Sequence, residues 1–180
     1  MNYKFLFLFP VLVFCSMMMD AQNPTDPEEQ LELSRKYVKQ QNPEKAAYWV
    51  KKAAEQGHAG AQAGLSGFYY FGIGVDKDYK EAVKWARKSA LQGNPSGQFM
   101  LGSYYENGFG VEKNIVEAIK WYRKAAEQDD ESAIAKLAQC YFYGKGVEKN
   151  RNEAIRLFKK AARMGEETSQ QMLRQLGESY

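Results

Sequence analysis

Cysteine and histidine are scarce in this chain of 180 residues, which holds two cysteines, Cys15 and Cys140, and one histidine, His58. Cys140 and His58 together cannot build a structural zinc site or a histidine metal triad. A Ser-His-Asp set with a recognisable local motif is also missing. We therefore expect no enzyme, no metal, no cofactor and no catalytic residue. His58 is interpreted as an ordinary polar residue before a helix, and Cys140 as a small apolar core residue.

A hydrophobic run long enough to span a bilayer is lacking as well. The apolar stretch 5–14 has about ten residues, roughly half of what a membrane helix needs. With the short basic segment before it, this stretch is typical of a secretory signal peptide, predicted at 1–21 with cleavage after Ala21 and a linker at 22–27. A lipoprotein site at Cys15 is the alternative, and a buried core helix is another. We expect export to the periplasm or the medium, and hence no nucleic-acid partner.

The chain is rich in internal repetition, with a period of 36 residues. The segment Gly-x-Gly-Val at 72–75 recurs at 108–111 and at 144–147. One column of the repeat holds Trp49, Trp85, Trp121 and Leu157. This period predicts a shortened first repeat at 28–57, full repeats at 58–93, 94–129 and 130–165, and a C-terminal capping helix at 166–180.

Each unit is predicted to form two helices, A and then B. The second half of a unit carries apolar residues at helical spacing. A candidate N-cap precedes it in every copy, at Asn42, Asp78, Asn114 and Asn150. A glutamate three residues later approximates a capping box in the last three copies. Glycines at 57, 93 and 165 are expected to end helix B in the left-handed conformation, and Asp129 breaks this column.

The repeated glycine pair raises the question of phosphate binding, because a Gly-x-Gly loop that opens a helix can hold an anion on free backbone N–H groups. A dinucleotide fingerprint would need a preceding strand and a third glycine, and a P-loop would need Gly-Lys-Ser/Thr. Here a helix precedes the pair and a segment such as Val-Glu-Lys-Asn at 147–150 follows it. The first glycine is interpreted as the end of helix A and the second as part of the turn into helix B.

Taken together, Leu-Gly-x-x-Tyr, Gly-x-Gly-Val and Ala-x-x-Trp-Tyr-x-Lys-Ala-Ala-Glu-Gln, as they stand between Leu101 and Gln128, resemble the Sel-1-like repeat family, a relative of the tetratricopeptide repeats. The resemblance covers residues 30–165. It implies an all-α fold, a right-handed α-solenoid that serves as a scaffold for protein complexes. A cysteine-rich branch of that family, with a suggested hydrolase activity on β-lactams, is not matched, because its cysteines are missing here.

Two surfaces are candidate binding sites. By analogy with tetratricopeptide arrays, helix A positions that face away from helix B line a concave groove. The groove residues are Tyr70, Phe71, Phe99, Ser103, Glu106, Asn107, Gln139, Phe142 and Tyr143. Aromatic residues there could anchor a peptide or helix, or they could pack against the next unit, and the sequence leaves both interpretations open.

The second surface is a basic ridge on helix B. It is formed by Lys52, Lys88, Arg123, Lys124, Lys159 and Lys160. Such a ridge could meet an anionic glycan, an anionic lipid or an acidic protein. The net charge of only +3, with glutamates within one turn of these residues, favours a solvated face that pairs with itself.

The sequence therefore predicts an exported, non-catalytic interaction scaffold that binds a protein or peptide segment in its groove. The alternative is an envelope factor that binds anionic glycan or lipid through the basic ridge. A hydrolase of the β-lactamase-like kind comes third.

Overall fold

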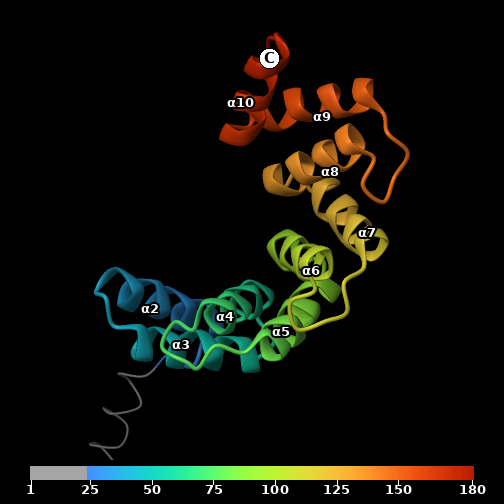
Figure 1. Ribbon diagram of the computed structural model, residues 1–180. Coiled ribbons are helices and arrows are strands. Elements are labelled where there is room, and N and C mark those ends of the chain that lie inside the picture. The colour runs from blue at the N-terminus through green and yellow to red at the C-terminus, as the bar shows by residue number, and fades with distance from the viewer. Residues whose placement is uncertain (1–23) are drawn as a thin grey trace, which may run out of the picture.

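The computed structural model of the chain describes residues 24–180, and all regular elements in this range are α-helices (Figure 1). The predicted signal peptide, its cleavage site and the alternative lipoprotein site at Cys15 lie outside the described residues. The helices are α2 (Pro27–Lys39), α3 (Pro43–Glu55), α4 (Ala59–Phe71), α5 (Tyr79–Leu91), α6 (Pro95–Asn107), α7 (Ile115–Ala126), α8 (Glu131–Tyr143), α9 (Arg151–Arg163) and α10 (Glu167–Leu176).

Helices that follow one another in the sequence pack against one another, so the chain forms a curved stack that ends in α10 (Figure 1). The A helices are α2, α4, α6 and α8, and the B helices are α3, α5, α7 and α9. Contacts between neighbouring units, without contacts across the molecule, define a solenoid. The prediction of an all-α solenoid is confirmed. None of the helices in the described range is long and apolar enough to cross a membrane.

The B helices begin where the sequence predicts. Asn42, Asp78, Asn114 and Asn150 each accept a backbone N–H from the first turn. Only one of the two hydrogen bonds of the expected capping box forms. The glutamate does not accept the backbone N–H of the N-cap residue, and Glu81, for example, accepts a hydrogen bond from the Lys84 ammonium at 2.8 Å instead. The Asp78 backbone N–H instead donates to the carbonyl of Tyr69, which ties helix B to helix A of the same repeat.

The glycine pair has two structural roles, as Gly108 and Gly110 illustrate. Gly108 ends α6 in the left-handed conformation with φ 77°. Gly110 also has a positive φ of 66°, and a Cβ there would collide with the carbonyl group of Tyr79 at the start of α5. The second glycine is therefore required because the loop lies directly on the preceding B helix, as well as for the turn itself.

The B helices end as predicted, and Asp129 adopts the conformation of the glycines that it replaces. Gly57, Gly93 and Gly165 have φ values of 93°, 84° and 104°. Asp129 has φ 59°, one of two non-glycine residues with positive φ among the described residues. A left-handed aspartate is tolerated but strained relative to glycine.

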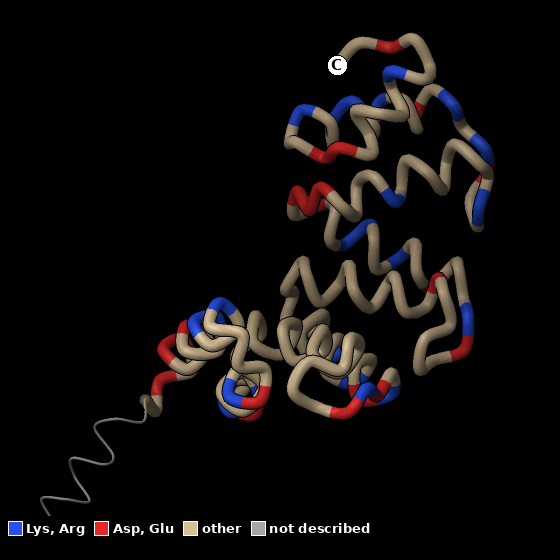
Figure 2. Tube along the Cα trace, turned by 60° about the vertical axis from the view of Figure 1, so that its left-hand side comes forward, with Lys and Arg blue, Asp and Glu red and all other residues tan. Residues whose placement is uncertain are grey.

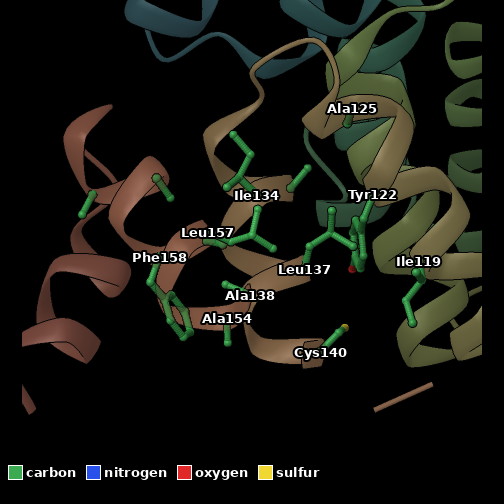
Figure 3. Packing of buried hydrophobic residues seen from close by; sticks show 14 of the residues in the cluster. Ile119, Tyr122, Ala125, Ile134, Leu137, Ala138, Cys140, Ala154, Leu157 and Phe158 are labelled. Carbon is green, nitrogen blue, oxygen red and sulfur yellow. The ribbon is translucent and has the colours of Figure 1, made fainter. Parts of the chain in front are cut away.

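The core runs along the stack as a chain of apolar clusters, of which Figure 3 shows the cluster around α7, α8 and α9. Small residues on the A helices set how closely the two helices of a unit approach. Gly102 is the clearest case, since a Cβ on it would lie 2.7 Å from the ring of Tyr122 and 3.1 Å from the carbonyl of Ala118. Ser66 takes the same place in the preceding unit and donates to the carbonyl of Ala82 at 2.8 Å.

A ladder of glutamine side chains, which the sequence reasoning missed, joins successive repeats. The Gln92 amide donates to Gln62 at 2.7 Å within its own repeat and to the carbonyl of Gly57 at 3.0 Å in the repeat before. Gln128 makes the same two bonds, at 2.8 Å each, to Gln98 and to the carbonyl of Gly93. The 36-residue spacing of Gln92 and Gln128 is visible in the sequence, but the sequence does not show which groups their side-chain amides contact.

Candidate partner-binding groove

The groove residues lie on α4, α6 and α8, the A helices of the three full repeats. These helices carry little charge: α4 has no charged side chain, and α6 has only Glu106. Glu131 and Lys136 are the charged residues of α8. The B helices differ sharply, because α9 alone carries six charged residues. Figure 2 shows this division, with charged positions sparse along α4 and α6.

Three aromatic groove residues are half-buried and pack within the solenoid. The ring of Tyr70 stacks on Tyr104 of the next A helix with centroids 5.5 Å apart. Phe99 lies 5.8 Å from Tyr122, and Phe142 lies 6.3 Å from Phe158. For these three residues the packing interpretation accounts for most of the side chain.

Two aromatic groove residues remain largely open to solvent. Phe71 is 68% exposed and Tyr143 is 54% exposed. Phe71 lies edge-on to Tyr70 with centroids 4.8 Å apart, and Tyr143 lies in the same way against Phe142 at 5.0 Å. Helices α4 and α8 thus each end in a packed ring that supports an exposed one. An exposed aromatic ring on a rigid support makes a good anchor for a partner, because little side-chain entropy is lost on binding.

A half-buried polar cluster joins α6, α7 and α8, and the sequence reasoning identified it only through Glu106. The Tyr122 hydroxyl donates to Glu106 Oε2 at 2.7 Å, and the Lys136 ammonium lies 3.4 Å from the same oxygen. Tyr122 is fully buried. Burial is the main cause that raises the pKa of its hydroxyl, and the neighbouring Glu106 carboxylate raises this pKa further. Tyr122 therefore remains a hydrogen-bond donor throughout the physiological pH range.

Tyr122 and Lys136 were missed for different reasons. The sequence placed Tyr122 correctly on the apolar face of helix B, but it gave no sign that the hydroxyl crosses to α6. Lys136 stands in no basic column of the repeat. The remaining polar groove residues are half-buried or exposed: Asn107 donates to the carbonyl of Ser103 at 2.8 Å, and Gln139 lies half-buried on α8.

A pocket of about 400 Å³ opens beside this polar cluster. It is lined by Glu106, Asn107, Lys113, Ile115, Lys145 and Gly146. The carboxylate of Glu106 is thus shared between the polar cluster and the pocket. The pocket can accept polar groups of a partner close to Tyr143, whose ring lies 5.4 Å from the Lys145 ammonium.

The basic ridge is engaged with the protein's own side chains. Lys88 and Lys124 lie over the indole rings of Trp85 and Trp121 at 4.2 and 4.3 Å, and Lys52 lies over Tyr48 at 5.6 Å. Arg123 donates to the Tyr141 hydroxyl at 3.2 Å, Lys159 pairs with Glu178 at 2.9 Å, and Lys160 pairs with Asp129 at 2.6 Å. Among the six cations, Lys159 and Lys160 are paired with carboxylates, while the other four contact neutral aromatic side chains and keep their charge.

His58 and Cys140 occupy structural positions. His58 caps α4, where its Nδ1 accepts the Ala61 N–H at 3.0 Å and its Nε2 lies 2.7 Å from Glu28. Cys140 is free and 2% exposed, and burial raises the pKa of its thiol. Within residues 24–180, no cluster of histidine, cysteine, aspartate and glutamate side chains could hold a metal ion.

Comparison with known proteins assigns the chain to a family. The model of the Sel1 repeat matches residues 33–58, 59–94, 95–130 and 131–166. The chain therefore belongs to the Sel1 repeat family, as the sequence motifs indicated. Proteins built from these repeats are in general scaffolds for protein interactions. No curated protein sequence matches the chain.

Several solved structures share the fold. A Sel1 repeat protein from Oxalobacter formigenes is 35% identical with a TM-score of 0.77, over 83% of this chain and 62% of that one. A protective antigen of uropathogenic Escherichia coli with the same repeat is also 35% identical with a TM-score of 0.77, over 86% and 34%. This chain thus spans less than two thirds of either relative.

A more distant relative comes from the cysteine-rich group. Cysteine rich protein B of Helicobacter pylori is 27% identical with a TM-score of 0.55, over 78% of this chain and 94% of that one. Residues 24–180 of the present chain contain a single cysteine, Cys140. The two proteins therefore share the helical solenoid, while cysteine cross-links between the helices are not available to the described part of this chain.

Proposed function

We propose that this chain is an exported, non-catalytic interaction scaffold that binds a segment of a partner protein in the groove along α4, α6 and α8. The observation that carries the proposal is the contrast between the two sets of helices. The A helices α4, α6 and α8 present exposed rings, amides and hydroxyls with few charged residues, whereas charged residues are frequent on the B helices. A nearly uncharged surface with fixed aromatic anchors suits a peptide or helix better than an anionic polymer.

Export is part of the proposal and rests on the sequence of the first 21 residues. Their basic start and short apolar run support a signal peptide. N-terminal sequencing of the protein recovered from its source organism tests this part independently of binding. A chain that begins at Gln22 is expected, and a chain that retains Met1 would contradict export by cleavage.

The binding experiment uses residues 22–180, immobilised and exposed to a solubilised envelope fraction of the source organism. Retained proteins are identified by mass spectrometry after washes at low and high salt. A discrete protein that survives high salt supports the groove, since binding through the basic ridge would be screened. Material that elutes with salt, or glycan and lipid alone, would favour the alternative function of the ridge.

Variants connect the retained partner to the groove. The double substitution Phe71→Ala with Tyr143→Ala removes both exposed rings and leaves the packed rings beneath them in place. The matched control is Leu91→Ala with Val116→Ala, two side chains that are 72% and 54% exposed on α5 and α7. We expect the first pair to abolish capture and the second to preserve it. Equal capture by both pairs would refute binding in the groove.

A further inference from the structure

The column of tryptophans on the B helices changes at the last repeat, where Leu157 takes the place of Trp85 and Trp121. Both indoles are buried, 6% and 7% exposed, and each packs into the repeat before its own. Trp121 belongs to a cluster with Ala90 and Leu101, and Trp85 to a cluster with the equivalent Ala54 and Leu65. The same seat is therefore filled by an indole at two successive junctions.

At the last junction this seat is partly empty. A pocket of about 330 Å³ opens between α7, α8 and α9. Its floor is formed by Ala126, Ile134, Leu137, Tyr141 and Leu157, and the charged side chains of Arg123, Glu127, Glu153, Arg156 and Lys160 complete its lining. Ala126 and Leu137 are the repeat equivalents of Ala90 and Leu101. Figure 3 shows Leu137 and Leu157 in the apolar cluster of this junction. Ala126 is half-buried, whereas Ala90 is only 2% exposed. The shorter leucine thus leaves uncovered an alanine that an indole covers elsewhere.

The mouth of the pocket keeps the cation that accompanies the indole in the other repeats. The lysine three residues after each of these two tryptophans lies over its ring: Lys88 at 4.2 Å from Trp85 and Lys124 at 4.3 Å from Trp121. Lys160 holds the same position after Leu157 and lines the pocket, where its ammonium pairs with Asp129 at 2.6 Å instead of with a ring. A ring seated there would meet a positive charge facing its negative π surface, which is a favourable electrostatic match.

We propose that this pocket is a second binding site, which receives a tryptophan side chain from a partner polypeptide. None of its lining residues belongs to the groove, so the proposal is independent of the groove function. The chain cannot fill the pocket from its own tryptophans, because Trp49, Trp85 and Trp121 are all buried in its B helices. An indole seated in the pocket would therefore come from another polypeptide.

The test uses the full chain, labelled with ¹⁵N, and N-acetyl-L-tryptophanamide as the probe. We expect saturable shifts confined to the amides around the pocket, above all those of Ala126, Tyr141 and Lys160, with a dissociation constant on the order of 1 mM for so small a ligand. N-acetyl-L-leucinamide is expected to bind at least about tenfold more weakly, because it offers no π surface to Lys160.

Leu157→Trp restores the indole in the pocket and is expected to abolish probe binding while leaving the melting temperature equal or higher. Its control is Leu91→Trp, which adds an indole at an exposed position and should leave probe binding unchanged. If Leu157→Trp lowers the melting temperature, Ala126→Leu blocks the pocket from α7 instead and must also abolish binding. The proposal is overturned if the pocket amides show no saturable shift, or if a folded variant with a filled pocket binds the probe as the wild type does.

Discussion

The hydroxyl of Tyr122 links α7 to the half-buried polar cluster of the groove, and removing it gives a sharp test of the structure. Tyr122→Phe keeps the ring and deletes the donor that reaches Glu106 at 2.7 Å. A hydrogen bond to a charged acceptor contributes about 1.5–3 kcal/mol. The tyrosine is fully buried, while the carboxylate keeps Lys136 as a partner at 3.4 Å. We therefore expect a loss of about 2 kcal/mol in the free energy of unfolding.

Urea denaturation at neutral pH, followed by circular dichroism, measures this loss. Glu106→Gln provides the second edge of a double-mutant cycle, because it removes the charge but keeps an acceptor oxygen. We expect a coupling energy of about 1 kcal/mol between the two positions. Tyr143→Phe, on an exposed ring, is the matched control and should change stability by less than about 0.5 kcal/mol. A coupling energy near zero would show that the hydroxyl and the carboxylate do not interact, and the proposed cluster would then be wrong.

Three further predictions test individual residues. Asp129→Gly should raise stability by up to about 1 kcal/mol, because it relieves the left-handed conformation and gives up only an exposed pair with Lys160; an unchanged melting temperature would argue against that placement. Burial raises the pKa of Tyr104 to about 12, so its contribution is complete below its ordinary pKa near 10 and is lost as pH rises through 12, by about 2–3 kcal/mol. Absorbance titration at 295 nm should show this late ionisation, and Tyr104→Phe should remove it. In a Cys15→Ser background, Cys140 should react with a disulfide reagent at pH 8 only after unfolding, since it is 2% exposed and burial raises its pKa; rapid labelling of the folded chain would refute its burial.

The sequence predicted the helices well because the repeat displays each signal several times. For example, Gly108 ends α6 and Asn114 begins α7 as expected, because capping is a local interaction between residues close in the sequence. The groove was predicted less well. Phe71 and Phe142 looked alike in the sequence, but one is 68% exposed and the other lies against Phe158. Exposure depends on the neighbouring helix, which the helical period alone does not reveal.

The departures from the repeat at the last junction form one feature in space. Leu157 replaces an indole that crosses to the preceding repeat at the other junctions. Ile134 and Met164 stand at the positions of the paired glutamines Gln98 and Gln128. The side-chain hydrogen bond from the second glutamine to the preceding repeat therefore has no counterpart at this junction. Both changes remove contacts between repeats, and the stability of a solenoid depends on such neighbour contacts. This junction relies instead on the apolar core around Tyr122 and Phe158, whose members Ile134, Leu137 and Leu157 also line the open pocket.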